Sequence, residues 1–244
     1  MNAVVLAAGF GRRLRPLTDE TPKALLAVGG TPLLDMAIRK LAASGFDRIA
    51  VNAHHHADRI EAHLRKAAFN AEVLLSREEE ILGTGGGVKR AASLLGGEGP
   101  LLVHNVDVLS DLPLAGLVEA HRKSGARATL AVMNRPTKRA LAVDDGNRIR
   151  GRWGEPPVSA PRGGTRPLAF NGIQVIDASF AEGLPGAGAF DLIDAYLERA
   201  AAGAAIEAHP MDGRYWADMG TPERFARAEA DLAEGRITLE GLMG

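Results

Sequence analysis

Residues suited to binding a polyphosphate stand at the beginning of the chain. An apolar run, residues 3–8, leads into a segment rich in glycine and arginine. Gly9 and Gly11 leave backbone amides open to a bulky anion, because no side chain blocks the approach. The cations beside these glycines are Arg12, Arg13, Arg15 and Lys23. The combination predicts a phosphate-binding loop, with a surface turn carrying solvated arginines as the alternative.

Two common phosphate-binding motifs do not match this segment. A P-loop ends in Gly-Lys-Ser/Thr, and the chain contains no Gly-Lys pair. The dinucleotide fingerprint has a third glycine three residues after the second, where this chain has Leu14. The second predicted strand also ends in Asn52 rather than in an acid that could bind a ribose. An NAD-dependent oxidoreductase is therefore disfavoured.

The elements that would position this loop alternate between strand and helix. Apolar periodicity predicts strands at 3–8, 48–52, 72–76 and 101–103, and helices at 31–45, 57–68 and 88–95, the first capped by Thr31. Such alternation is typical of parallel strands joined by crossover helices, and ligands then bind beyond the carboxyl ends of the strands. That edge would collect the first loop, residues 52–56 and Asp107.

Two aspartates follow apolar strands and could hold a metal ion. Asp107 comes after the apolar run 101–103, and Asp218 comes after Trp216-Ala217. Carboxylates placed there can hold Mg²⁺ against a substrate phosphate. Capping of the next turn or helix is the alternative at both positions, since Thr221 begins a predicted closing helix at 222–233.

A run of glycines, Gly83 to Gly87 around Thr84, predicts a loop ahead of the helix that begins at Val88. Four glycines in five residues weaken a helix start through backbone entropy. A flat ligand group lying on bare backbone, with Thr84 as a hydrogen-bond partner, would explain them; a flexible loop is the alternative.

The second half of the chain is less regular. Its predicted elements are a helix at 113–124, a strand at 128–133, an antiparallel pair at 141–143 and 148–153, a Gly/Pro-rich loop at 154–167, a strand at 168–176 interrupted by Gly172, and a helix at 192–202. A glycine within a strand often marks the close approach of another group.

Other catalytic arrangements are missing from the sequence pattern. His54, His55 and His56 alternate in direction on an extended segment, so all three cannot face one zinc ion. No Ser-His-Asp or paired-glutamate pattern stands out. A phosphate oxygen would need no such base, because it is already anionic at neutral pH.

Composition limits the partners. The chain has 244 residues, a net charge of −1 and no cysteine. No broad basic face for nucleic acid is implied, and no apolar run approaches the roughly 20 residues of a membrane span. With no charged leader, we expect a cytoplasmic protein without membrane or nucleic-acid partners.

Taken together, these motifs resemble the sugar-1-phosphate nucleotidyltransferases. The family signature Leu-Ala-Ala-Gly-x-Gly-x-Arg-Leu-x-Pro-Leu-Thr, followed by Pro-Lys, matches residues 6–18 and 22–23. Its glycine-threonine element matches residues 83–87, and its strand-end aspartate matches Asn105-Val106-Asp107, with valine in place of glycine. Its sugar-side glycine matches Asn171-Gly172, and its second metal carboxylate matches Asp218.

The resemblance implies a Rossmann-like three-layer α/β/α fold with a mixed, mostly parallel sheet, of the nucleotide-diphospho-sugar transferase type. Residues 1–244 would form one domain, with a nucleotide-binding half at about 1–112 and a sugar-binding half at about 113–235. A monomer or small homo-oligomer would bind a nucleoside triphosphate and a sugar 1-phosphate and release pyrophosphate.

The resemblance also implies residue roles. Arg13 and Lys23 would be catalytic, Arg13 on the departing pyrophosphate and Lys23 spanning the phosphates of both substrates; Asp107 and Asp218 would hold Mg²⁺. The implied nucleotide-binding residues are Leu6, Ala7, Ala8, Gly9, Gly11, Arg12, Arg13, Lys23, Gly83, Thr84, Gly85, Gly86 and Asn105, with the base against Gly85 and Gly86. The implied sugar-binding residues are Asn171, Gly172, Glu155 and Arg152.

The sugar side departs from the family pattern. The chain lacks the Val-Glu-Lys-Pro segment of many relatives and has Trp153-Gly154-Glu155-Pro156 in roughly that place. Arg152, Arg166 and Lys138 are the cations that could replace its lysine. UTP and N-acetylmuramate 1-phosphate are the expected substrates, for cell-wall recycling. The alternatives are GTP with mannose 1-phosphate, and an inactive module that senses a nucleotide sugar.

Overall fold

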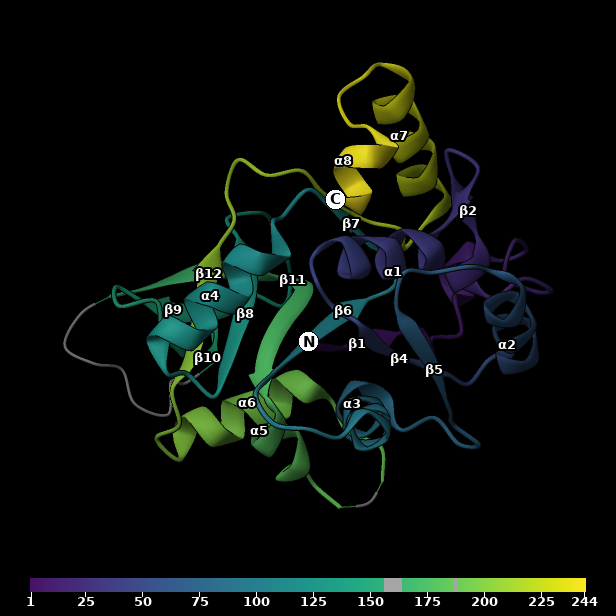
Figure 1. Ribbon diagram of the computed structural model, residues 1–244. Helices are drawn as coiled ribbons and strands as arrows, with labels where there is room; N and C mark the ends of the chain where they lie inside the picture. The colour runs from purple at the N-terminus through teal and green to yellow at the C-terminus, as the bar shows by residue number, and fades with distance from the viewer. Residues whose placement is uncertain (156–163, 187) are drawn as a thin grey trace.

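A nine-stranded mixed sheet forms the centre of the protein, with helices on both faces (Figure 1). The computed structural model describes residues 1–155, 164–186 and 188–244. The strands of this sheet are β1 (Asn2–Leu6), β4 (Arg48–Ala53), β5 (Glu72–Arg77), β6 (Pro100–Asn105), β8 (Ala128–Met133), β9 (Leu141–Asp144), β10 (Ile149–Arg152), β11 (Thr165–Asp177) and β12 (Ile206–Pro210). Their order is β10-β9-β11-β6-β1-β4-β5, and β8 pairs with both β11 and β12.

The strands from the first half of the chain are parallel. In the order β6-β1-β4-β5 they all run in one direction, with Leu6 opposite Asn52 on one side and Asn105 on the other. The carboxyl ends of three strands therefore lie side by side. This arrangement confirms the predicted strand and helix alternation and the Rossmann-like α/β fold.

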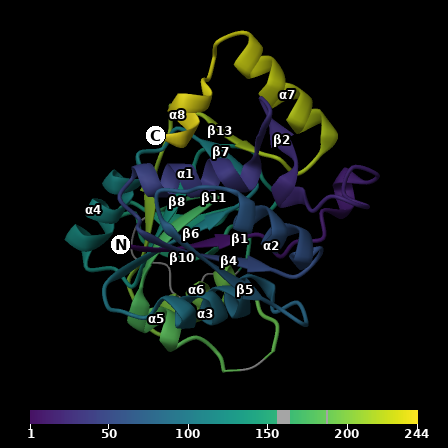
Figure 2. The ribbon, with the colours of Figure 1, turned by 45° about the vertical axis from the view of Figure 1, so that its right-hand side comes forward.

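Two apolar cores, one on each face of the sheet, hold the three layers together. The helices are α1 (Leu33–Ala43), α2 (Ala57–Lys66), α3 (Gly83–Leu95), α4 (Leu114–Ser124), α5 (Ala178–Glu182), α6 (Leu192–Ala201), α7 (Pro222–Ala233) and α8 (Leu239–Met243). Helices α1, α2 and α4 pack their apolar stripes on one face, whereas α3, α5 and α6 cover the other (Figure 2). The buried side chains Ile38, Ile60 and Leu117 mark the first core, and Val88 and Tyr196 the second.

The sheet changes from parallel to antiparallel pairing at β11. This strand runs antiparallel to β6 through residues 173–177 and to β9 through residues 165–168. Gly172 has φ +80°, and the register between β11 and β8 shifts between Phe170 and Gln174. The strand begins at Thr165 rather than at Leu168, since residues 165–167 pair with β9. Within the predicted loop 154–167, residues 156–163 lie outside the described residues.

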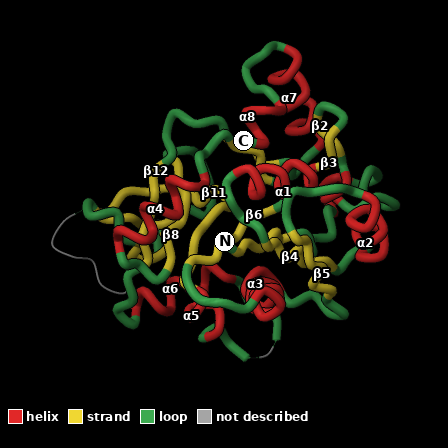
Figure 3. The backbone as a smooth tube through the Cα atoms, viewed as in Figure 1, coloured by secondary structure: helices red, strands yellow, loops and turns green. Residues whose placement is uncertain are grey.

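Two small strand pairs supplement the main sheet (Figure 3). Strand β2 (Ala27–Val28) pairs with β3 (Thr31–Pro32), and β7 (Val108–Ser110) pairs with β13 (Trp216–Asp218). Thr31 is therefore part of a strand, and the expectation that it caps α1 is wrong: Pro32 holds the cap position and no side chain bonds the helix start. Thr221 does precede α7, although without a side-chain capping bond.

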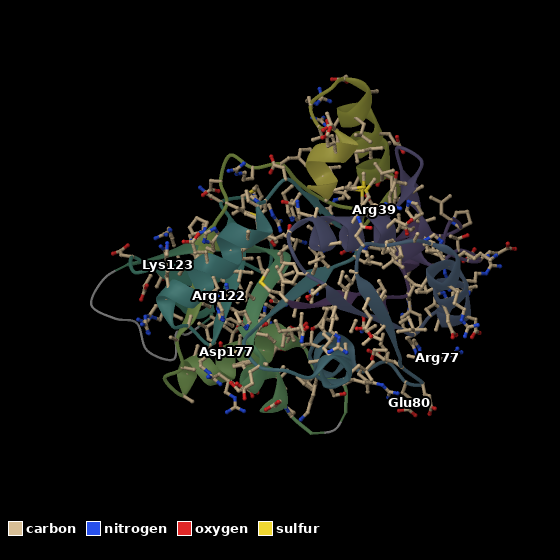
Figure 4. All side chains as sticks on the ribbon, in the orientation of Figure 1. Arg39, Arg77, Glu80, Arg122, Lys123 and Asp177 are labelled. Carbon is tan, nitrogen blue, oxygen red and sulfur yellow. The ribbon has the colours of Figure 1, made fainter. Side chains whose placement is uncertain are left out.

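Charged side chains cover the periphery, as the labelled Arg77, Glu80 and Lys123 show in Figure 4. Exposed ion pairs join some of them, such as Arg77 with Asp58 at 2.5 Å. Within the part of the chain that the structure describes, no helix has the length and apolarity to cross a bilayer.

Candidate active site

A cavity of about 370 Å³ opens at the carboxyl ends of β1, β4 and β6. Its lining is Leu6, Ala7, Ala8, Gly9, Gly11, Arg12, Arg13, Leu14, Lys23, Asn52, Ile81, Gly83, Thr84, Asn105, Val106, Asp107 and Gly220. The structure thus brings together the predicted first loop, part of the glycine run and the first aspartate. Asn52, from the predicted edge segment 52–56, also lines the cavity, and the structure adds Ile81 and Gly220, which the sequence pattern did not single out.

The two positions of the first loop are occupied by glycine for different physical reasons. Gly11 has φ +64°, and a Cβ there would lie 2.8 Å from Thr18 Cγ2. The Thr18 hydroxyl also donates a hydrogen bond to the Gly11 carbonyl, at 2.9 Å. Gly9 is exposed, has no positive φ and would meet nothing within 4 Å if it carried a Cβ. Packing within the chain therefore requires glycine at position 11 only, and the open face of Gly9 is free for a ligand.

The four cations of the first segment point to different partners. Lys23 begins a short 3₁₀ helix, Lys23–Leu25, and forms an ion pair with Asp107. The Arg13 guanidinium lies 3.0 Å from the point where a Gly220 Cβ would be, beside the Asp218 carboxylate. Arg12 stacks over Phe10, 4.9 Å from the ring centre.

Arg15 differs from the other three. It does not line the cavity, and its Nε lies 3.2 Å from Asp19 on the exposed side of the loop. Arg13 and Lys23 are thus the cations that lie beside the two aspartates.

The β7–β13 pair brings Asp107 and Asp218 together from distant parts of the sequence. Asp107 follows β6 directly, and Asp218 lies opposite Val108 in the register of the pair. The Met219 N–H donates to the Asp107 carbonyl at 2.7 Å, which locks the two backbones beside each other. The carboxylates are paired with cations, Asp107 with Lys23 and Asp218 with Arg224.

Asp107 lines the cavity and Asp218 lies beside it, and two neighbouring carboxylates suit a hard divalent cation such as Mg²⁺. Magnesium is bound in proteins by one or two carboxylates together with substrate phosphates and water. Among the described residues, no group of three or more His, Asp or Glu side chains gathers into a complete ligand set. The donor set at Asp107 and Asp218 therefore fits an ion that takes its remaining ligands from substrate.

A buried polar network ties the first loop to the start of α3. Asn52 is 2% exposed, and its Oδ1 accepts from the Ala7 N–H at 2.7 Å. Its Nδ2 donates to the buried Glu78 carboxylate at 2.7 Å, and Glu78 also accepts from the Leu82 N–H at 3.0 Å. A Cβ on Gly87 would lie 2.5 Å from Asn52 Nδ2, so this glycine makes room for the network. The sequence signal for this network is an asparagine at the end of a buried strand.

The glycine run is helical, contrary to the prediction of a loop. Helix α3 begins at Gly83, and the run forms its first turns. The glycines are needed for packing: a Cβ on Gly85 would lie 2.0 Å from the Phe190 ring, and one on Gly86 would lie 2.8 Å from Leu82 Cβ. The close contact made by the chain itself outweighs the entropic cost of glycine in a helix.

Thr84 connects the cavity to α6. Its Oγ1 accepts a hydrogen bond from the Leu192 N–H at 2.8 Å, and the Gly85 N–H donates to the Phe190 carbonyl at 3.0 Å. Thr84 and Gly83 line the cavity, whereas Gly85 and Gly86 lie beneath Phe190 and Leu82.

The three histidines support the first loop. His54 and His55 each lie 5.5 Å from the Phe10 ring, centre to centre. His56 has φ +53° and precedes α2, and its Nε2 lies 3.1 Å from the Asp19 carbonyl. Burial lowers the pKa of His55, and the neighbouring His56 adds to the effect.

The predicted sugar-side residues fall in two places. A Cβ on Gly172 would lie 2.9 Å from Asn105 Nδ2, so Asn171 and Gly172 adjoin the main cavity. Arg152 and Glu155 line a separate polar hollow of about 370 Å³, where Arg152 pairs with Asp194 of α6. Of the other two candidate cations, Lys138 lines that hollow and Arg166 bonds Asn147 at 2.6 Å.

Comparisons with known proteins identify a family and relatives of this chain. Residues 2–142 match the family model described as Nucleotidyl transferase. The chain is 33% identical over 245 residues to an N-acetylmuramate alpha-1-phosphate uridylyltransferase of Caulobacter vibrioides, covering 95% of this chain and 97% of that protein. It is 32% identical over 251 residues to a mannose-1-phosphate guanylyltransferase of Mycobacterium tuberculosis, covering 100% of this chain and 68% of that protein.

Solved structures share the fold. A UDP-glucose pyrophosphorylase of Acinetobacter baumanii superposes with a TM-score of 0.79 at 21% identity, over 98% of this chain and 95% of that one. HddC of Yersinia pseudotuberculosis, complexed with GMP-PN, superposes with a TM-score of 0.76 at 22% identity, over 95% and 99%.

Proposed function

The chain belongs to the nucleotidyl transferase family, and we propose that it transfers the uridylyl group of UTP to N-acetylmuramate 1-phosphate. The sugar-1-phosphate nucleotidyltransferase reaction follows from the family. The choice of substrates rests on one observation, the match to the uridylyltransferase of Caulobacter vibrioides over nearly the full length of both chains. The products are pyrophosphate and a nucleotide sugar for cell-wall recycling.

The nucleoside triphosphate lies over the first loop in this proposal. Gly9 offers the open backbone for the phosphates, and Arg13 binds the departing pyrophosphate. Ile81, Gly83 and Thr84 face the base in this proposal, since they line the same cavity as the first loop. Contacts of the base with Gly85 and Gly86 require Phe190 to move, since its ring lies on Gly85.

Asp107 and Asp218 hold Mg²⁺ in this proposal. The bound ion supplies charge neutralisation for the phosphates. Lys23 then exchanges its partner, from the Asp107 carboxylate to the phosphates of the two substrates. Asn171 and Gly172 receive the sugar, with Arg152 and Glu155 as outer sugar contacts from the polar hollow.

The chemical step needs no general base from the protein. One phosphate oxygen of the sugar 1-phosphate, already anionic, forms a bond to the α-phosphorus of the triphosphate. The bond from that phosphorus to the bridging oxygen breaks, and its electron pair leaves on pyrophosphate. The cations and backbone amides align the two phosphates and stabilise the added negative charge, which is how phosphoryl transfer is generally accelerated.

A panel of substrates tests this proposal. Pyrophosphate release is measured for UTP, GTP, CTP and dTTP, each with N-acetylmuramate, mannose and glucose 1-phosphates. UTP with N-acetylmuramate 1-phosphate should give the highest kcat/KM, by at least about tenfold, a ratio that pocket contacts can supply. No release with any pair, together with binding of a nucleotide sugar in calorimetry, would instead identify an inactive sensing module.

A second candidate is the transfer of guanylyl from GTP to mannose 1-phosphate. It is favoured by the match to the guanylyltransferase of Mycobacterium tuberculosis along the whole of this chain. The highest kcat/KM with GTP and mannose 1-phosphate would replace the first proposal by this one.

We further propose a single domain that works in the cytoplasm as a monomer or small homo-oligomer. Light scattering of the purified protein measures its mass. Fractionation of the source cells locates it.

A further inference from the structure

Arg135, directly after β8, lies against the residues that adjoin the main cavity on its sugar side. Its Nε donates to the Asn171 side-chain oxygen at 3.2 Å, and its Nη2 donates to the Phe170 carbonyl at 2.9 Å. Its guanidinium carbon lies 3.8 Å from the centre of the Trp216 ring. Three elements, β8, β11 and β13, thus fix one half-buried cation.

The stacking places this cation near Asp218. Trp216 and Asp218 are two residues apart in β13, so their side chains leave the strand on the same face. The Asp218 carboxylate raises the pKa of Arg135, while partial burial, the larger effect, lowers it. Arg135 therefore lies on the face of β13 that carries the second predicted metal ligand.

Among the residues that the structure describes, Arg135 has no anionic partner. Of the described residues, no carboxylate comes within ion-pair distance of it, and its hydrogen-bond acceptors are the neutral oxygens of Asn171 and Phe170. Nearby Arg224 and Lys23 each pair with an aspartate. A partly desolvated guanidinium whose hydrogen-bond acceptors are neutral is costly, and an anionic ligand would compensate it.

A second polar group beside Arg135 is also without a partner. Arginine only donates, so the Asn171 oxygen must face Arg135, and the amide orientation is fixed. The Asn171 Nδ2 is then left without a hydrogen-bond partner among the described residues, in a side chain that is 1% exposed. Two donors, the buried amide of Asn171 and the Nη1 of Arg135, thus have no partner among the described residues.

We propose that Arg135 binds the phosphate of the sugar 1-phosphate and supplies the cation that the chain lacks at the family's lysine position. This inference rests on the proposed function. The three cations considered from the sequence are less well placed: Arg152 and Lys138 line the separate hollow, and Arg166 is bound to Asn147.

The test compares Arg135→Ala and Arg135→Lys with Arg214→Ala. Arg214 is an exposed arginine two residues before Trp216, outside the cavity lining. R135A should raise KM for the sugar 1-phosphate at least about tenfold, as expected for the loss of one charge-assisted contact. Its triphosphate affinity, measured by calorimetry without acceptor, and its melting temperature should stay close to those of the wild type.

The lysine variant separates charge from shape. R135K should restore part of the affinity, since an ammonium carries the charge but cannot bond Asn171, Phe170 and a phosphate at once. R214A should behave like the wild type. An unchanged KM in R135A, or an equal loss of triphosphate affinity and stability, would overturn the inference.

A binding measurement keeps this test separate from the proposed function. If the wild type turns over no substrate pair, calorimetry with mannose 1-phosphate and with free mannose still tests Arg135. A preference for the phosphorylated sugar that R135A loses supports the inference, and a preference that R135A retains refutes it.

Discussion

The two sides of the cavity are held by different kinds of strand. On the nucleotide side, β6, β1 and β4 are parallel and stop at the cavity, so their terminal loops lie side by side. On the sugar side, antiparallel β11 runs past the cavity and places Gly172, in its middle, against Asn105 of the cavity lining. The position of a residue at a strand end decides its role in the first case, and strand register decides it in the second.

The glycines near the cavity also differ in how closely the rest of the chain packs against them. Gly9 has open space above it, whereas Gly85 and Gly172 are in close contact with other parts of the chain. A glycine that the fold does not need is a candidate for ligand contact, and a glycine that the fold needs carries no such implication. Substitution can separate the two kinds.

The largest effect, on kcat, is expected from substitution of the carboxylates of Asp107 and Asp218, because they come from different sides of the cavity. Asp107→Ala and Asp218→Ala should each lower kcat by about 10³-fold, since each removes a ligand from an ion that neutralises phosphate charge. The double variant should lose little more, because the two act as one unit. Asp145→Asn, in the exposed turn between β9 and β10, is the control. Full activity in either alanine variant would assign metal binding to one side alone.

The next largest effect is expected on the free energy of unfolding. It concerns His104 in β6, the strand that both sides of the cavity share. Burial lowers the pKa of His104 to about 4, with the positive charge of Lys40 adding to the effect. The unfolded chain therefore binds a proton first as the pH falls from 6.5 to 4, and the free energy of unfolding decreases across that window. The decrease attributable to His104 is on the order of 3 kcal/mol and is complete below pH 4.

Urea unfolding measured from pH 4 to pH 7 checks this expectation. His104→Asn, which stays neutral and can still donate to the Asn105 carbonyl, should show a shallower dependence than the wild type. Identical slopes in the two proteins would mean that other groups cause the loss of stability.

Gly85→Ala should destabilise the protein by about 2 kcal/mol, because the new methyl group overlaps the Phe190 ring. Phe190→Ala combined with it should recover part of that loss. Thermal unfolding of both single variants and the double variant measures the coupling. Additive effects would show that Gly85 and Phe190 do not press on each other, and would reopen Gly85 as a ligand contact.

Gly9→Ala should have the smallest effect, and this effect should be on substrate binding rather than on stability. Since a Cβ there meets no atom of the described residues within 4 Å, the melting temperature should stay unchanged. The KM for the triphosphate should rise about tenfold, because the methyl group keeps the phosphates away from the backbone. Gly11→Ala is the counterpart, and it should lower the melting temperature because of its positive φ and its contact with Thr18. A stable G9A variant with normal KM would remove Gly9 from the binding site.

Much of the nucleotide side could be predicted from the sequence, because its elements are local. The apolar strands and the amphipathic helices each have a clear period, and parallel strands place their ends together. That reasoning placed the first loop, residues 52–56 and Asp107 at one edge of the sheet, and the first loop, Asn52 and Asp107 do line one cavity. It did not predict the hydrogen-bond partners of Asn52, because Ala7 and Glu78 are distant from it in sequence.

The helical state of the glycine run could not be predicted. Local propensity disfavours a helix there, and the compensating contact comes from Phe190, more than a hundred residues further on. Helix α8 and strand β7 were missed for a similar reason: each is short and is held by a distant partner, α1 for one and β13 for the other.

The sequence by itself determined the chemical groups of the site. It also determined the strand ends that carry the first loop and Asp107, because residue types and short apolar periods can be read directly from the sequence. Only the tertiary structure decided that Asp218 meets Asp107, that Gly85 is covered while Gly9 is open, and that Arg135 lies on Trp216 beside Asn171. These are contacts between segments far apart in sequence. Strand pairing sets them, and the period of one strand does not specify which distant strand it pairs with.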